Sequence, residues 1–193
     1  NFIQKNVKSP NSNRRINSDF VDLKWTQVSK LRDEVSLEAA TTIQEELEAY
    51  VNQFNDAKPE VLRLKTKITT HPIVMLNIKK DMKGKELCLQ GLEIARKLKD
   101  VQLEIIFLYH LTDYLILERK LQEYIDTCEQ ALSIEISNNI ESSYHFAIVS
   151  NLLDAYMYKG GAENRVEELL FSLYNDEDSK LYSFEFYMRF LNT

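Results

Sequence analysis

Hydrophobic residues along most of the chain recur every three or four positions, a spacing that aligns them on one face of an α-helix. The first such run begins after Asp19, and its apolar positions are Val21, Trp25, Val28, Leu31 and Val35. A second run starts at Ser36, a residue type that caps helices, and contains Ile43, Leu47, Tyr50 and Phe54. No stretch alternates apolar and polar residues as a half-buried strand does. The pattern therefore predicts an all-α fold.

The third predicted helix carries a proline in its interior. It begins near Pro59, which a helix accepts in its first turn. Pro72 lacks a backbone donor and disfavours helical geometry at His71. The segment therefore either breaks at this point or kinks and continues through Met75 to about Lys79, and we expect the kink.

The rest of the chain continues the helical pattern. Further apolar stripes predict helices over about 84–98, 100–117, 121–136, 141–158, 166–173 and 181–191. Gly160 and Gly161 form the chain's one doubled glycine, which is a strong helix terminator. The sequence thus predicts about nine helices.

Composition narrows the classes of protein that this chain can belong to. The 193 residues hold only 4 Gly and 3 Pro, too few for the many tight turns of an all-β domain. The net charge of −6 argues against binding to the nucleic-acid backbone, which requires a surplus of Lys and Arg. No run of about 18 apolar residues and no signal peptide is present, so we expect no membrane association. Cys88 and Cys128 lack CxxC spacing and are predicted to be reduced core residues of a cytoplasmic protein.

The chain ends differ in composition from the middle. Residues 1–18 are rich in Asn, Ser, Lys and Arg, and we interpret them as a flexible tail or linker. Arg14 and Arg15 in this tail either touch nucleic acid or membrane or are simply solvated, and we favour the second interpretation. The absence of an initiator Met and the abrupt end at Thr193 indicate a piece of a longer protein.

An internal repeat points to a particular helical architecture. Gly91-Leu92-Glu93-Ile94-Ala95 lies 40 residues before Ala131-Leu132-Ser133-Ile134-Glu135, and Cys88 matches Cys128 at the same offset. A further 41 residues on, Cys128 corresponds to Leu169 and Ala131 to Ser172. A period of this length that spans two predicted helices indicates a repeated helix pair.

This pattern resembles the tetratricopeptide repeat family over residues 60–175, most closely at 105–138. The matching positions are Leu108, Leu111, Thr112, Leu115, Tyr124, Cys128 and Ala131. Leu153, Tyr124 and Arg165 depart from the motif because they are bulky where small residues are usual, and the spacing is about 40 instead of 34. The longer spacing is similar to that of repeat domains in bacterial regulatory proteins. The resemblance implies that residues 19–193 form a tetratricopeptide-like superhelix with a concave surface.

The resemblance also implies a binding site on the concave surface. Its members would be Tyr109, His110, Asp113, Asn151, Asp154 and Tyr158. In peptide-binding members of the family an Asn at the position of Asn151 holds the ligand backbone, although Asn is also common on any polar helix face. Asp113 and Asp154 recur at nearly the repeat offset, and they either favour a basic ligand together or are two solvated carboxylates.

No recognisable enzyme chemistry appears in the sequence. His71, His110 and His145 are far apart and lack the short spacings of metal ligands, so we interpret them as structural or surface residues. No phosphate-binding glycine loop is present, and both cysteines lie on apolar stripes. We therefore expect no catalytic residues, no metal and no cofactor, and we keep an enzyme with an unrecognised site as the least favoured alternative.

The sequence thus predicts a non-enzymatic module that binds a peptide or protein partner, as the sensory or scaffolding part of a larger regulatory protein. An alternative is a structural assembly subunit. It rests on a cluster of aromatic residues near the chain end, Tyr182, Phe184, Phe186, Tyr187 and Phe190. These are more than one helix face can bury, so the last helix is either wedged between others or exposes a patch for a homodimer.

Overall fold

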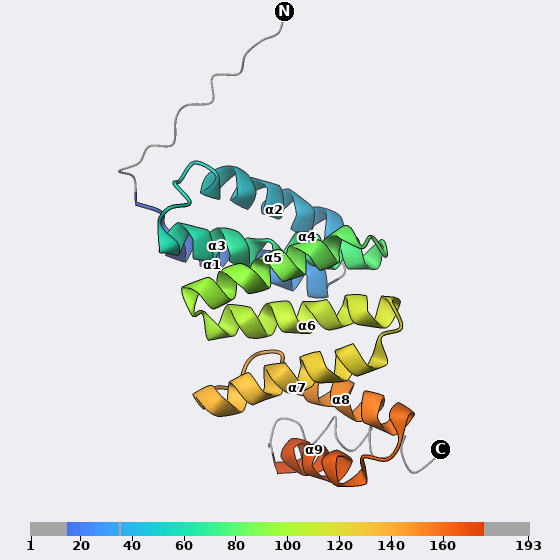
Figure 1. Cartoon of the computed structure of the whole chain (residues 1–193). Coiled ribbons are helices and arrows are strands. Elements are labelled where there is room, and N and C mark those ends of the chain that lie inside the picture. Colours follow the sequence, from blue (N-terminus) through green and yellow to red (C-terminus); the bar gives the residue numbers. More distant parts are fainter. Residues whose placement is uncertain (1–14, 35, 176–193) are drawn as a thin grey trace, which may run out of the picture. The chain divides into compact units, whose positions relative to one another are not determined.

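The computed structural model of the chain describes residues 15–34 and 36–175, and every regular element in these residues is an α-helix (Figure 1). The helices are α1 (Ser18–Asp33), α2 (Leu37–Val51), α3 (Pro59–Ile68), α4 (Thr70–Ile78), α5 (Lys83–Leu98), α6 (Val101–Leu117), α7 (Leu121–Asn138), α8 (His145–Lys159) and α9 (Glu163–Asn175). The prediction of an all-α fold is confirmed. The predicted helix 181–191 and the aromatic residues near the chain end lie outside the described residues. The tetratricopeptide-like superhelix stays a prediction.

The chain divides into two compact units, one ending at Leu103 and one starting at Glu104. In the first unit α1 packs against α2, α2 packs against α3, and α5 contacts α3 and α4. The apolar stripes that the sequence predicts form its core: Val21 and Val28 from α1 and Leu47 from α2 are almost completely buried. Trp25 packs against the same core while staying partly exposed.

The predicted tail extends too far into the folded part of the chain. Ile16 is only 6% exposed and belongs to the core of the first unit. Asn17 caps α1, because its side-chain Oδ1 accepts a hydrogen bond of 3.1 Å from the backbone N–H of Phe20. Composition averaged over the segment concealed this single apolar residue and the cap beside it. Residues 15–18 are therefore not part of a tail.

The third predicted helix is interrupted at Thr69, three residues before Pro72. The helix ends at Ile68, Thr69 keeps near-helical angles (φ −69°, ψ −11°), and α4 then runs to Ile78, close to the expected end. Pro72 cannot donate to the carbonyl four residues earlier, which belongs to Ile68. The buried side chain of Gln44 donates to that carbonyl instead, at 2.8 Å. A side chain from α2 thus satisfies the acceptor that the proline leaves without a backbone partner.

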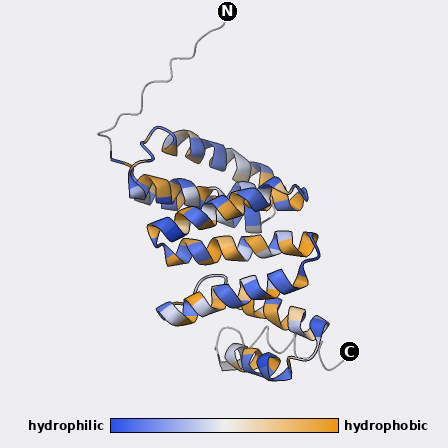
Figure 2. Ribbon diagram, in the orientation of Figure 1, coloured by the Kyte–Doolittle hydropathy of each residue, from blue (hydrophilic) through white to orange (hydrophobic). Residues whose placement is uncertain are grey.

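The second unit contains most of α6 together with α7, α8 and α9. In it α7 packs against α8, and α8 packs against α9. Figure 2 shows hydrophobic and hydrophilic residues interleaved along these helices, as expected for helices that bury one face. The most completely buried large side chains of this unit are Tyr114, Phe107, Ile105, Leu108, Ile148, Leu152, Leu153 and Leu169.

Helix ends recur along the chain with nearly constant spacing. Lys80, Lys99, Arg119 and Asn139 all adopt the left-handed conformation, with φ between 50° and 58°. At each of them the next residue donates its N–H to the carbonyl five positions earlier, as Asp100 does to Ala95 at 2.9 Å and Ile140 to Glu135 at 3.1 Å. This is the Schellman motif that closes many helices. Lys80, Lys99, Arg119 and Asn139 follow one another at intervals of 19, 20 and 20 positions.

Among the described residues, no helix is both long enough and apolar enough to cross a lipid bilayer.

Candidate partner-binding site

The six residues predicted to bind a partner lie on two helices of the second unit (Figure 1). Tyr109, His110 and Asp113 are on α6, and Asn151, Asp154 and Tyr158 are on α8. Residues three or four apart on a helix share a face, so each group forms one continuous strip. One member of each group, Asp113 and Asp154, acts electrostatically on Tyr124 of α7.

His110 lies at the base of this arrangement. It is only 3% exposed, and neither of its ring nitrogens has a hydrogen-bond partner in the part of the chain that the structure describes. The Nδ1 atom is 4.0 Å from the Asp113 carboxylate. The ring centroids of Tyr109 and Tyr144 lie 5.4 Å and 5.7 Å from that of His110, and the two tyrosine rings are 4.5 Å apart in a tilted contact. The imidazole is thus enclosed by two aromatic rings and faces one carboxylate.

Tyr124 lies close to residues from both other helices. Burial raises the pKa of its hydroxyl strongly, and the negative charges of Asp154 and Asp113 and the neighbouring Tyr109 raise it further. Asp113 of α6 and Asp154 of α8 therefore both act electrostatically on the same phenol. We call Tyr109, His110, Asp113, Tyr124, Tyr144 and Asp154 the tyrosine–aspartate cluster.

The two remaining predicted residues extend the cluster along α8. Asn151 is half-buried and lies three residues before Asp154, so both occupy the same face of the helix. Tyr158 lies one turn further and is 85% exposed, outside the cluster. Sequence reasoning missed Tyr124 as part of the site because it matched a packing position of the repeat. It missed Tyr144 because that residue was expected inside a helix.

Tyr144 is positioned by a short connection between α7 and α8. The expected helix start near Glu141 was wrong, since α8 begins at His145. Glu135 at the end of α7 is buried, and its carboxylate accepts hydrogen bonds from the Ser142 backbone N–H at 3.0 Å and pairs with His145 Nδ1 at 2.6 Å. Burial by itself raises the pKa of Glu135, but the hydrogen bonds from His145 and Ser142 outweigh burial and keep the pKa below its usual value. A charged carboxylate thus holds the turn that presents Tyr144 to His110.

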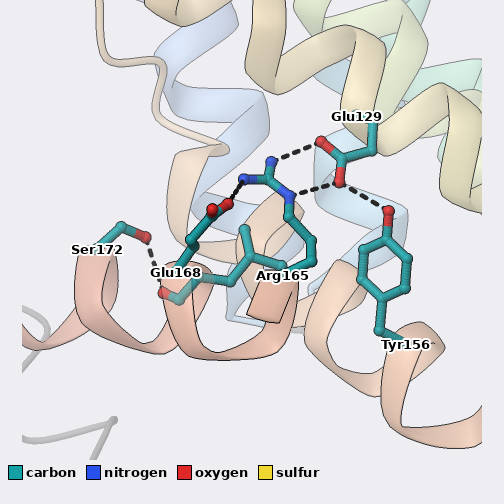
Figure 3. A network of polar contacts seen from close by, with 6 residues as sticks. Glu129, Tyr156, Arg165, Glu168 and Ser172 are labelled. Atoms are coloured by element: carbon teal, nitrogen blue, oxygen red, sulfur yellow. Dashed lines mark hydrogen bonds and ion pairs between the residues drawn. The ribbon is translucent and has the colours of Figure 1, made fainter. Parts of the chain in front are cut away.

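A second polar network ties α9 to α7 and α8 (Figure 3). The Glu129 carboxylate accepts two hydrogen bonds from the Arg165 guanidinium, at 2.8 Å and 2.6 Å, and a third from the Tyr156 hydroxyl at 2.8 Å. The bonds from Arg165 lower the pKa of Glu129, while burial and the bond to Glu129 raise the pKa of Tyr156 to about 12. Two-pronged pairing of this kind fixes the angle between helices as well as their contact. The network stabilises the scaffold of the second unit.

A pocket of about 480 Å³ lies between the end of α8 and α9. Its lining is mostly apolar, with two carboxylates, and includes Met157, Gly160, Val166, Leu170, Glu163 and Glu167. Phe171, the residue after Leu170, is 68% exposed. The pocket therefore offers a mostly apolar surface next to two carboxylates.

The two cysteines are packing residues, as the apolar stripes predicted. Both are buried, and burial together with the nearby Glu129 raises the pKa of Cys128 to about 12. A thiol with such a pKa stays protonated and is a poor nucleophile. In the part of the chain that the structure describes, no three His, Cys, Asp or Glu side chains are grouped so that they could hold a metal ion.

Comparison with known proteins gives no match to this chain among protein-family models, curated proteins or solved structures.

Proposed function

We propose that this chain is a non-enzymatic binding module that holds a segment of a peptide or protein partner, as part of a larger regulatory protein. The binding surface consists of the tyrosine–aspartate cluster and its continuation at Asn151 on α8. The observation that carries the proposal is the buried His110, whose ring nitrogens have no hydrogen-bond partner among the described residues, beside the Asp113 carboxylate and the rings of Tyr109 and Tyr144.

The chemistry of the cluster favours binding over catalysis. Tyrosine rings give large, rigid contact areas at a low entropic cost, and carboxylates and an amide beside them supply hydrogen-bond acceptors and donors. A nucleophilic mechanism requires a thiol, hydroxyl or amine activated by a neighbouring base. Cys128, which acts on Tyr124, is instead kept in its protonated form by burial. The groups that converge here can recognise a ligand without changing it.

The proposal is tested by selecting binders from a random twelve-residue peptide library displayed on phage and measuring the synthetic peptides by titration calorimetry. Asn151→Ala and Tyr109→Ala remove one polar and one aromatic group of the proposed surface. Each is expected to weaken binding about 5- to 100-fold, the range of a truncated interface hot spot. Circular dichroism confirms that the helical content of each variant is unchanged.

Glu141→Ala is the matched control, because Glu141 is an exposed residue of the α7–α8 connection that lies outside the cluster. It is expected to bind every selected peptide like the wild-type chain. Peptides whose affinity is unaffected by Asn151→Ala and Tyr109→Ala but reduced by Leu170→Ala would contradict the proposal and assign binding to the pocket between α8 and α9.

A further inference from the structure

We propose that the tyrosine–aspartate cluster recognises a basic side chain, Arg or Lys, in its partner. This inference rests on the proposed function and specifies the chemistry of the ligand at the same surface. Three independent features of the cluster lead to it: the sign of its charges, the unsatisfied imidazole at its base and the aromatic rings that enclose it.

The charges of the cluster are of one sign. Asp113 on α6 and Asp154 on α8 both act on Tyr124, and both raise its pKa. The Asp113 side chain is about one third exposed, at 32%, and Asp154 is exposed. Two accessible carboxylates that converge in this way attract a cation from a partner.

The imidazole of His110 is a second observation that points to a ligand. Its nitrogens are buried without partners among the described residues, although an unsatisfied buried polar atom costs on the order of 1–3 kcal/mol. Nδ1 faces Asp113 at 4.0 Å, which is too long for a hydrogen bond. Neutral imidazole has one acceptor nitrogen, to which a ligand ammonium or guanidinium that reaches the ring can donate.

The aromatic rings complete a site for a cation. The ring centroids of Tyr109 and Tyr144 lie 4.5 Å apart, and both rings contact His110. Tyr109 also acts electrostatically on Tyr124. A guanidinium or ammonium is attracted to the face of a tyrosine ring, and the attraction adds to that of nearby carboxylates. The site therefore favours Arg and Lys over neutral side chains of the same length.

The test uses two short peptides that differ in charge but hardly in shape, acetyl-Ala-Ala-Arg-Ala-Ala-amide and the same peptide with citrulline in place of Arg. Each is titrated into the ¹⁵N-labelled full chain, and amide shifts of the cluster and ring ¹⁵N shifts of His110 are followed by NMR. The Arg peptide is expected to shift these signals saturably, with an affinity about tenfold higher than that of the citrulline peptide, the ratio for about 1.4 kcal/mol of charge-dependent binding. A Lys peptide should resemble the Arg peptide.

Variants test which carboxylates cause the preference for Arg over citrulline. Asp154→Asn and Asp113→Asn are each expected to remove most of the preference for Arg over citrulline. Asp126→Asn is the matched control, because Asp126 is an exposed carboxylate of α7 that acts on Tyr156 and not on Tyr124. It should leave the preference unchanged.

Two outcomes would overturn the inference, and they differ in whether they also contradict the proposed function. Equal shifts of the cluster with the Arg and citrulline peptides would mean a peptide-binding surface without charge preference. This result would contradict the recognition of a basic side chain and would leave the proposed binding function intact. No shift at the cluster with these peptides, or with any peptide selected from the library, would overturn both.

Discussion

At the scale of single residues, His71 shows how the fold holds a histidine neutral. The side chain is buried in the first unit, and its Nε2 atom lies 3.3 Å from the Thr41 hydroxyl. That hydroxyl donates its only proton to the Leu37 carbonyl at 2.8 Å, so it must accept from His71, and the ring proton is on Nε2. Burial lowers the pKa of His71, and the nearby positive charge of Arg32 lowers it further.

This environment predicts a pH-dependent stability. A histidine whose pKa is lower in the folded state than its ordinary 6.5 takes up a proton in the unfolded chain first as the pH falls. The free energy of unfolding is therefore expected to be highest above about pH 6.5 and to decrease as the pH falls toward the folded-state pKa. Urea unfolding at about pH 7.5 and about pH 5.5 measures the decrease. His71→Gln keeps a donor toward Thr41 and should show a smaller decrease, whereas an identical decrease would mean that other groups cause it.

At the scale of elements, three side chains donate hydrogen bonds to backbone carbonyls at the junction of α3 and α4. The Thr69 and Thr70 hydroxyls donate to the carbonyls of Thr66 and Lys67 at 2.7 Å and 2.9 Å, and the Thr66 carbonyl also accepts the backbone N–H of Thr69 at 3.2 Å. Gln44 of α2 donates to the Ile68 carbonyl, to which Pro72 has no N–H to donate. Three successive carbonyls at the helix end thus accept side-chain hydrogen bonds, which stabilises a proline-interrupted segment inside the core.

This junction predicts coupling between Gln44 and Pro72. Gln44→Leu leaves the buried Ile68 carbonyl without a donor and is expected to lower the free energy of unfolding by about 1–2 kcal/mol. In the Pro72→Ala background, a backbone N–H at position 72 can serve the same carbonyl, so Gln44→Leu should cost about 1 kcal/mol less. Chemical unfolding of the four proteins of this double-mutant cycle measures the difference. Additive effects of the two substitutions would show that the carbonyl does not link them.

At the scale of the whole molecule, the net charge affects how fast the chain associates with a charged partner. The chain carries a net charge of −6, and the proposed surface adds a local concentration of carboxylates. A field of this sign speeds the approach of basic partners and slows that of acidic ones, and dissolved salt screens it. Long-range charge and the local cluster therefore act in the same direction.

The affinity for the Arg peptide should consequently depend on ionic strength. Raising NaCl from about 0.05 M to about 0.5 M is expected to weaken its binding by about three- to tenfold, because the screening length falls from well above to well below 10 Å. The citrulline peptide serves as the control and should bind with nearly constant affinity over this range. NMR titrations at several salt concentrations measure both, and a flat response of the Arg peptide would exclude an electrostatic basis for its recognition.

Particular residues show which features were predictable. The stripes containing Val21, Leu47 and Cys128 identified buried positions correctly, because the spacing of apolar residues within one helix decides which face it buries. His110 was selected for the proposed site from its repeat position, but its burial and its missing partners among the described residues were not predictable. They depend on Tyr144, which reaches His110 only because Glu135 and His145 hold the preceding turn.

The sequence by itself determined the class of fold and the approximate bounds of most helices, since both follow from interactions between residues close in the chain. Tertiary structure alone decided which polar groups meet. Gln44 and Ile68 are 24 positions apart, Thr41 and His71 are 30 apart, and Glu129 and Arg165 are 36 apart. Such pairs form only after helices have packed at a particular angle and register, and no local pattern in the sequence encodes that angle.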